Sequence, residues 1–374
     1  MRAGAEDGKT GHAPADEPGS VVAVPGRSAR GPAGASGPAP ADGTGGAGPG
    51  ASGPGSAGGA GGEARGSGLA AAGGAAAVLL GAAAWGSTGT AAHFAPAGAS
   101  SVSVGAARIV LGGAVLLVMA AARRRSRGEL RAMLGSRGAG RAGLALATVS
   151  VSAYQLCFFS AVRLTGVAIG TVVAIGSAPV LTGLISRLTG GGALTRRWML
   201  ATAGAVSGCV VLVTGGRAAG VSLPGVGLAL AAGLCYSCYA VAAARLISRG
   251  TGERAVMAAL FGGGAVILAP VLAATSTGWL LSARGLAVTV YLGVVTTVAA
   301  YLLYGRGLRS VPAPAAVTLG LAEPLVAALL GLVVLGERLS GASVAGLVLV
   351  GLALAALAVP GRTWRPGRPP RGTG

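Results

Sequence analysis

Long apolar runs follow one another along the chain from Leu69 onward, with short polar or glycine-rich segments between them. They fall at about 69–91, 102–121, 143–162, 166–186, 198–214, 224–244, 255–275, 286–305, 311–335 and 341–359. Each is close to the ~20 residues that an α-helix needs to cross ~30 Å of hydrocarbon. The runs are continuous and do not alternate in period two, which excludes the strands of a membrane β-barrel. The pattern predicts an all-α polytopic membrane protein with ten transmembrane helices.

Residues 1–68 have a different composition, built from Gly, Ala, Pro and Ser with scattered charges of both signs. They carry too few bulky apolar side chains to offset the entropy of ordering them. No short apolar segment follows basic residues at the start, so no secretory signal is expected. We predict a disordered tail over 1–68, a first membrane unit over 69–214, a second over 223–360 and a basic tail over 361–374.

The distribution of charge orients the predicted spans. Only 10% of the residues are charged and 52% are apolar, yet the formal net charge is +19. Such an excess can indicate a nucleic-acid partner, but here the arginines lie between apolar runs. With the N-terminus inside, the cytoplasmic loops and the C-terminal tail contain nineteen arginines and the outside loops four, as the positive-inside rule requires. We expect the inner (cytoplasmic) cell membrane, both termini in the cytoplasm and no nucleic-acid partner.

The two membrane units resemble each other. Residues 106–117 (AARIVLGGAVLL) align with 257–269 (MAALFGGGAVILA), and 164–184 align with 309–329. The offsets of about 150 and 145 residues match spans 1–5 to spans 6–10. A unit with an odd number of spans inserts its second copy upside down, and two such halves enclose a site near the midplane that either side can reach. Two inverted five-helix repeats therefore predict a carrier of a small solute.

Glu323 lies in the middle of the ninth run, directly before Pro324. At 1.5 Å per residue it is roughly 18 Å from the predicted cytoplasmic end, near the midplane. A carboxyl group at that depth needs a partner, a proton or a wet cavity. Two interpretations remain open: a proton or cation site, and a protonated structural acid that bonds the carbonyls freed by Pro324.

Arg108, in the second run, is another charge within a predicted span. Its long side chain could snorkel to the membrane surface. Alternatively it faces the cavity, where it would pair with Glu323 or receive a substrate carboxylate.

Other polar and aromatic side chains at mid-depth are candidates for lining a cavity. They are Trp85, Ser87, Thr88, Tyr154, Gln155, Tyr236, Tyr239, Thr296, Thr297 and Tyr301. Trp198 and Tyr304 lie nearer the predicted cytoplasmic interface, where we expect them to act as anchors. Pro179 and Pro324 occupy matched positions in the repeat and are expected to break their helices, turning backbone carbonyls toward the cavity.

No pattern for catalysis or metal binding emerges from the chain. The four cysteines (Cys157, Cys209, Cys235 and Cys238) lie inside apolar runs without further ligands near them. The phosphate-binding pattern GxxxxGK[ST] is absent, so ATP is not expected to drive the protein. Six of the ten acidic residues lie within residues 1–68, which leaves no acid pair for general acid–base chemistry. We expect no enzymatic activity, no cofactor and no metal.

Several short motifs extend over residues 69–360. They are Trp85-Gly86-Ser87, Ala107-Arg108, Pro179, Ala322-Glu323-Pro324 and Leu335-Gly336-Glu337-Arg338-Leu339-Ser340, followed by Gly346 and Gly351. Together with two five-helix halves, this set resembles the EamA-type transporters of the drug/metabolite transporter superfamily. One departure is Gly192-Ala193-Leu194-Thr195, where such families often repeat Gly-Glu-x-Leu-Thr. The resemblance implies export of amino acids, other metabolites or drugs.

The sequence thus predicts a secondary transporter that exports small metabolites, amino acid-like compounds first. One alternative is efflux of cationic or amphipathic drugs, for which Glu323 would be the attracting charge. Another is a membrane scaffold or sensor that transports nothing. The expected partners are a small-molecule solute and the lipid bilayer, with a coupled proton and a second copy of the chain, as a homodimer, still to be tested.

Overall fold

The computed structural model describes residues 58–215, 222–334, 336, 338 and 340–359, and these residues form helices and turns without any strand. Helix α1 (Gly58–His93) begins ahead of the boundary predicted at residue 68. The disordered tail expected over 1–68 is therefore helical over its last residues, since a helix nucleated by the apolar span extends backwards at low cost. Residues 1–57 and the predicted tail over 361–374 lie outside the described residues.

Ten helical segments in the described part of the chain are long and apolar enough to cross a bilayer, which confirms the prediction from hydropathy. Their bounds are Leu69–His93 in α1, Ser101–Ala122 (α2), Gly140–Gly166 and Ile169–Leu188 in α4 (Ala139–Leu188), Arg196–Thr214 (α5), Leu223–Ser248 (α6), Glu253–Ala273 (α7), Ala283–Gly307, Ala313–Val334 and Gly341–Ala358 (α12). The eighth comprises α8 (Ala283–Val290), the π-helix η2 (Tyr291–Ala299) and α9 (Ala300–Gly307). The ninth comprises α10 (Ala313–Leu319) and α11 (Ala322–Val334).

Short polar residues set where many of these helices begin. At the N-termini of five helices, the hydroxyl of the residue before the helix accepts a hydrogen bond from the backbone N–H three residues later in the chain. These residues are Ser100 before α2, Thr195 before α5, Ser222 before α6, Ser282 before α8 and Ser340 before α12. Each hydroxyl satisfies a backbone donor that has no partner within its own helix. The two spans in α4 meet at Gly166, whose φ of 82° suits glycine.

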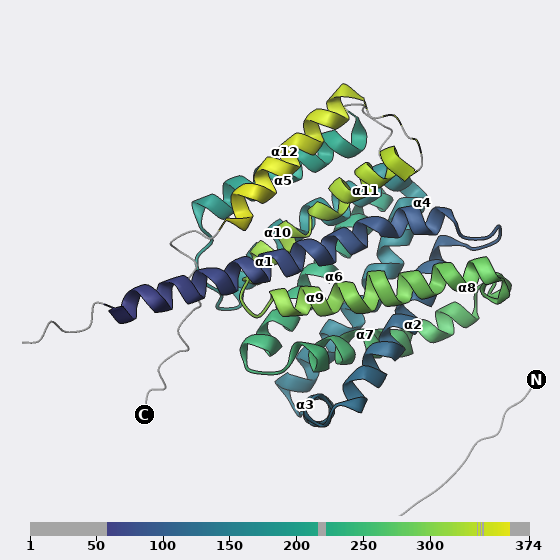
Figure 1. Ribbon diagram of the computed structural model, residues 1–374. Coiled ribbons are helices and arrows are strands. Elements are labelled where there is room, and N and C mark those ends of the chain that lie inside the picture. The colour runs from purple at the N-terminus through teal and green to yellow at the C-terminus, as the bar shows by residue number, and fades with distance from the viewer. Residues whose placement is uncertain (1–57, 216–221, 335, 337, 339, 360–374) are drawn as a thin grey trace, which may run out of the picture. The chain divides into compact units, whose positions relative to one another are not determined.

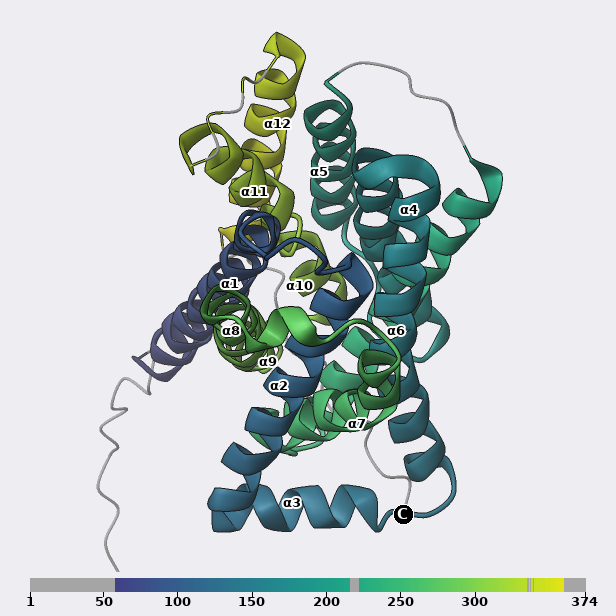
Figure 2. The same ribbon diagram turned by 90° about the vertical axis from the view of Figure 1, so that its right-hand side faces the viewer.

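Helices from the two membrane units pack against each other in pairs. Helix α5 lies beside α12, α2 beside α7, and α4 beside α6 (Figures 1 and 2). Glycines bring the backbones close: a Cβ placed on Gly208 of α5 would lie 2.8 Å from the backbone nitrogen of Val350 in α12. Such contacts are how helices associate in lipid, where no hydrophobic force drives them together.

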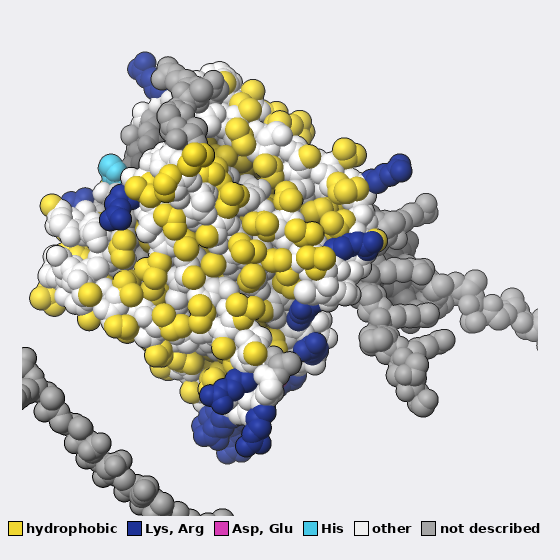
Figure 3. Space-filling model, turned by 180° about the vertical axis from the view of Figure 1, so that it is seen from behind, with side chains coloured by type: hydrophobic (Ala, Val, Ile, Leu, Met, Phe, Trp, Pro, Cys, Tyr) yellow, Lys and Arg dark blue, Asp and Glu magenta, His cyan; other side chains and the backbone are white. Residues whose placement is uncertain are grey.

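The outer face of the bundle carries the apolar side chains that a bilayer would cover. Leu200, Val266 and Val333 are each at least 70% exposed. In Figure 3 hydrophobic side chains cover the middle of the visible face, and Lys and Arg side chains lie toward its edges. The surface therefore has the apolar band and polar ends of a membrane protein.

A short helix that the sequence did not reveal connects the second and third spans. This helix, α3 (Arg124–Leu134), buries Ser126, Leu130 and Met133. Figure 1 shows α3 end-on and α1 lengthwise, so α3 lies crosswise to α1; Figure 2 shows α3 lengthwise. A second short element, the 3₁₀ helix η1 (Gly278–Leu281), precedes α8.

Candidate functional site

A small cavity lies inside the bundle where six helices meet. Its lining residues are Trp85 from α1, Arg108 from α2, Tyr154 and Ile175 from α4, Tyr236 and Tyr239 from α6, Tyr301 from α9 and Glu323 from α11. About 20 Å³ is open to the centre of a water molecule, enough for about one water. Sites for small organic ligands measure roughly 300–1,000 Å³. The helices must therefore separate before the cavity admits a solute.

Of the twelve residues that the sequence predicts to bind a solute or to line a cavity, seven come together around this one. The other five (Ser87, Thr88, Gln155, Thr296 and Thr297) are not among its lining residues. Gln155 is buried next to Tyr154, and Thr296 is buried in η2, where its hydroxyl donates to the Leu292 carbonyl at 2.8 Å. Ile175 is a lining residue that the sequence analysis missed, because an isoleucine inside an apolar run gives no signal of its own.

Two opposite charges face the same cavity. Arg108 is half-buried, and its Nε is buried without a hydrogen-bond partner. The ion pairs within 4.0 Å among the described residues are Arg125–Glu129 and Arg309–Glu253, so Arg108 and Glu323 are not directly paired. The buried Nε favours the cavity interpretation of Arg108 over snorkelling to the surface.

Aromatic rings form most of the remaining wall. Trp85 contacts Tyr301 with ring centroids 4.9 Å apart, and Tyr236 contacts Tyr239 at 5.2 Å. The hydroxyls of Tyr239 and Tyr301 are 3.3 Å apart and share a hydrogen bond. Phe261 of α7, which the sequence did not mark as a candidate, packs behind Tyr301 with the two ring centroids 3.8 Å apart. Aromatic faces attract cations and pack against apolar groups, so this wall suits an organic solute that carries a positive charge.

The expectation that Trp198 and Tyr304 anchor at the interface is wrong. Tyr304 is fully buried, and its ring lies 5.3 Å from that of Trp85. Trp198 is 9% exposed, and its indole Nε1 donates to the hydroxyl of Thr318 at 3.1 Å. Gly183 leaves room for the indole, because a Cβ there would lie 2.6 Å from the Trp198 ring. Both side chains point into the bundle even though they lie near the ends of their helices.

The ninth span is broken directly before Glu323. Helix α10 ends at Leu319 and α11 begins at Ala322. The N–H of Glu323 bonds the carbonyl of Gly320 at 2.9 Å, three residues back, in a tight turn. Pro324 explains the position, because a proline has no N–H and its ring clashes with the carbonyl four residues earlier, which is that of Gly320. The break expected from Pro324 is therefore present and lies on the N-terminal side of the proline.

The break expected at Pro179 is absent, since α4 continues through that residue. Two hydroxyls bond carbonyls close to the proline: Ser177 donates to Ala174 at 3.2 Å, and Ser237 of α6 donates to Ala178 at 2.9 Å. Neither of these carbonyls is that of Ile175, which loses its helical N–H donor to Pro179; the hydroxyl bonds instead tie α4 to itself and to α6 beside the proline.

A glycine in α1 brings the broken span close to the cavity wall. A Cβ on Gly86 would lie 2.6 Å from the carbonyl oxygen of Glu323 and 2.7 Å from Cβ of Val326. The absence of a side chain at Gly86 lets α11 lie against α1 beside Trp85. The carboxyl group and the indole consequently line the same cavity.

The described residues offer little for a metal ion. All four cysteines are free, with Cys209 buried and the others half-buried. Within the described residues no group of three His, Cys, Asp or Glu side chains could hold a metal.

Comparison with known proteins gives three similarities. The model of the EamA-like transporter family matches residues 72–214 and again residues 223–359. The chain is 36% identical over 246 residues to the uncharacterized transporter YwfM of Bacillus subtilis (strain 168), which covers 66% of this chain and 80% of that one. A solved crystal structure of a protein superposes with a TM-score of 0.63 at 24% identity, over 78% of this chain and 96% of the other, which is a likeness of fold.

Proposed function

The chain belongs to the EamA-like transporter family, and from this premise we propose that it is a secondary transporter that exports a small zwitterionic metabolite, amino acid-like compounds first. One observation carries the substrate class. Arg108 and Glu323 face one cavity without pairing with each other. An α-amino acid supplies a carboxylate for the arginine and an ammonium group for the acid, and charge-assisted hydrogen bonds to both would hold it.

Alternating access between two inverted halves is the proposed mechanism. The family model matches each half once, and each half contains five spans, an odd number that inverts the second copy. Equivalent helices of the two halves also pack together: the second span (α2) on the seventh (α7), and the fifth (α5) on the tenth (α12). A two-fold relation between the halves accounts for such pairing, and rocking one half against the other would expose the cavity to each side in turn.

We further propose that Glu323 couples transport to protons. The carboxyl group lines the cavity and makes no ion pair within 4.0 Å, so a proton and the solute's ammonium group would compete for it. The orientation proposed from the arginines has both termini in the cytoplasm and the protein in the inner membrane.

The test is solute counterflow in proteoliposomes that contain the full chain. Pools of labelled amino acids and of lipophilic cations are loaded separately, with protein-free liposomes as background. We expect the protein to exchange amino acids. Arg108→Gln should weaken their apparent affinity by about 10- to 100-fold, because it removes one hydrogen bond to a charged group. Arg309→Gln serves as the matched control, because Arg309 pairs with Glu253 outside the cavity.

Three results would contradict parts of this proposal. Exchange of lipophilic cations without amino acids would favour drug efflux, for which the aromatic wall and Glu323 are suited. An equal loss of amino acid affinity in Arg108→Gln and Arg309→Gln would show that Arg108 does not bind the solute. Folded protein that exchanges no solute would favour a scaffold or sensor.

A further inference from the structure

Helix α3 carries two opposite faces with different chemistry. Arg124, Arg127 and Arg131 follow the helical spacing i, i+3, i+7 and form a single stripe, and all three are exposed. Ser126, Leu130 and Met133 form the opposite stripe and are buried. The proposed transport mechanism makes no use of the arginine stripe.

Contacts at both ends and along its length fix the position of α3. A single residue, Arg123, separates it from the end of α2 at Ala122, and the next span begins at Gly140. The carboxylate of Glu129 accepts the backbone N–H of Gly252, which caps α7, at 3.2 Å. Its other oxygen accepts a hydrogen bond from Arg125 Nε at 3.0 Å. The helix is therefore held at the end of the bundle, and its one acid is already engaged.

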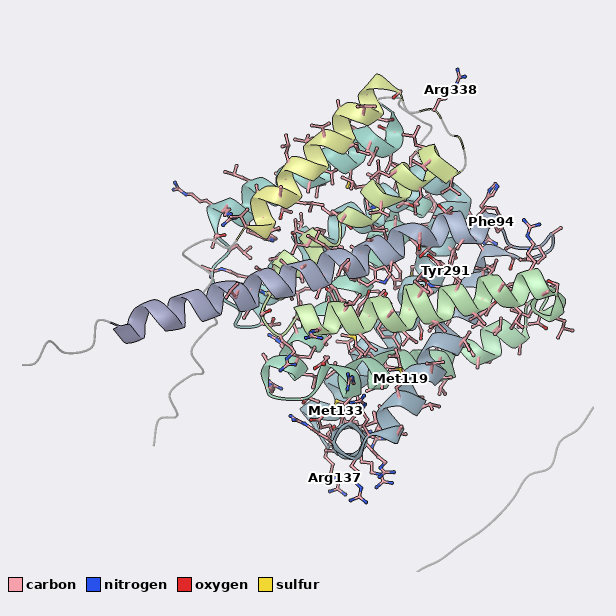
Figure 4. The ribbon with its side chains drawn as sticks, viewed as in Figure 1. Phe94, Met119, Met133, Arg137, Tyr291 and Arg338 are labelled. Atoms are coloured by element: carbon pink, nitrogen blue, oxygen red, sulfur yellow. The ribbon has the colours of Figure 1, made fainter. Side chains whose placement is uncertain are left out.

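This position puts the arginine stripe at the depth of lipid headgroups. The spans on either side of α3 end within a few residues of it, so the helix cannot move away from the membrane surface. It lies crosswise to α1 (Figures 1 and 2), as an interfacial amphipathic helix does. Figure 3 shows a dense group of Lys and Arg side chains at the bottom of the molecule, where α3 lies, and Figure 4 labels Arg137 there, at the outer edge of the bundle.

We propose that this surface binds the phosphates of anionic phospholipids in the leaflet where α3 lies. Residues 123–141 contain seven arginines and one acid, and every one of these arginines is exposed. A guanidinium group binds a phosphate through two parallel hydrogen bonds. An acidic protein would match the charge equally well, but lipid phosphates surround a helix held at this depth at far higher local concentration. The partner is therefore a phospholipid. The binding surface consists of Arg124, Arg127 and Arg131 together with the flanking Arg123, Arg137 and Arg141.

The experiment measures lipid binding and is independent of transport. Full-length protein in a neutral detergent is titrated with phosphatidylglycerol or with phosphatidylcholine, and the midpoint of thermal unfolding is recorded. We expect only phosphatidylglycerol to raise the midpoint, and added salt to weaken the effect. A juxtamembrane arginine contributes about fivefold to such binding, so the triple variant R124Q/R127Q/R131Q should bind on the order of 100-fold more weakly.

Matched variants separate this surface from charge in general. The control R187Q/R249Q/R306Q removes three exposed arginines from three separate loops and should weaken the response to phosphatidylglycerol far less than the α3 triple variant, because these arginines do not share one stripe. The variant R124K/R127K/R131K keeps the charge and should retain partial binding. If the triple glutamine variant does not fold, Arg127→Gln alone should shift the titration by about fivefold.

Specific outcomes would overturn the proposal. One is an equal response to phosphatidylglycerol in the unaltered protein and in the α3 variants. Another is an equal loss in the control triple, which would make total charge responsible. A third is stabilisation by a polyglutamate peptide without any response to phosphatidylglycerol, which would make the surface a site for an acidic protein.

Discussion

The fourth and ninth spans occupy equivalent positions in the repeat, yet they differ at the centre of the bundle. Alignment at an offset of 145 residues places Ala178-Pro179 on Glu323-Pro324 and Ile175 on Gly320. In the fourth span the helix continues through its proline, whereas in the ninth it is broken. Ile175 and Glu323 both line the cavity. The fourth span therefore supplies a continuous helix with an apolar lining residue, and the ninth supplies a turn and a carboxyl group.

The residue four positions before each proline explains much of this difference. A proline ring crowds that carbonyl in any helix. In the ninth span the residue there is Gly320, which has low helix propensity, and a Cβ at this position would lie 3.1 Å from the hydroxyl of Tyr236. In the fourth span it is Ile175, and the hydroxyls of Ser177 and Ser237 bond carbonyls beside the proline. The two halves thus differ in structure at this depth through a few residues.

The largest expected effect comes from removing the charge that only the ninth span carries. Glu323→Gln keeps the shape of the side chain but cannot take up or release a proton. We expect it to abolish transport driven by a pH gradient while leaving the protein folded, as monitored by solute uptake with and without the gradient. Glu253→Gln, outside the cavity, is the control and should keep the gradient response. Unchanged pH dependence in Glu323→Gln would end the coupling proposal.

Replacing each proline in turn tests the difference between the spans directly. Pro324→Ala permits a continuous ninth helix, which relieves a helix penalty of about 3 kcal/mol. We expect a higher unfolding temperature together with slower transport. Pro179→Ala should leave the transport rate within about twofold, because the helix is already continuous through that residue. Equal losses of transport in the two variants would contradict a division of roles between the spans.

The contact between α1 and the broken span can be tested at Gly86. A methyl group there would collide with the backbone of Glu323, and overpacking of this kind costs about 1–3 kcal/mol. We expect Gly86→Ala to lower the unfolding temperature and to weaken solute binding. Gly89→Ala is the matched control on the same helix, because nothing lies within 4 Å of a Cβ at that position. If the two variants unfolded at the same temperature, the close approach of α11 to α1 would be refuted.

The smallest expected effect concerns the bond between the fifth and ninth spans. Trp198→Phe removes the indole donor to the Thr318 hydroxyl and should cost about 0.5–1.5 kcal/mol. Thermal unfolding of Trp198→Phe, Thr318→Val and the double variant gives the coupling energy. Strictly additive effects would show that the two side chains do not stabilise each other.

Much of the architecture could be predicted from the sequence because a bilayer imposes a fixed length on every apolar run. The spans and the depth of Glu323 follow from that length, and the repeat follows from the sequence similarity of the two halves. The same reasoning located Trp85, Tyr154 and Tyr301 at the level where the cavity lies. Charged and aromatic residues are rare in this chain, so their positions were informative.

What the sequence did not reveal depends on tertiary contacts. Ile175 and Phe261 are ordinary apolar residues, and only the packing of neighbouring helices makes them part of the cavity wall or its support. The π-helix over 291–299 and the continuity of α4 at Pro179 depend on which hydroxyls and carbonyls meet. Helix α3 is amphipathic, but the arginine count in its segment was interpreted only as a topology signal.

The glycine contacts between equivalent helices have a mechanical consequence. Gly113 of α2 lies against the Phe261 carbonyl of α7, and Gly346 of α12 lies against the Gly208 carbonyl of α5. At these points main chain meets main chain, and side chains of the facing helix pack beside them, Leu117 of α2 against Gly262 and Val350 of α12 against Gly208. A methyl group added at Gly113 or Gly346 would force its pair of helices apart, so these two glycines determine how closely the equivalent helices of the two halves approach.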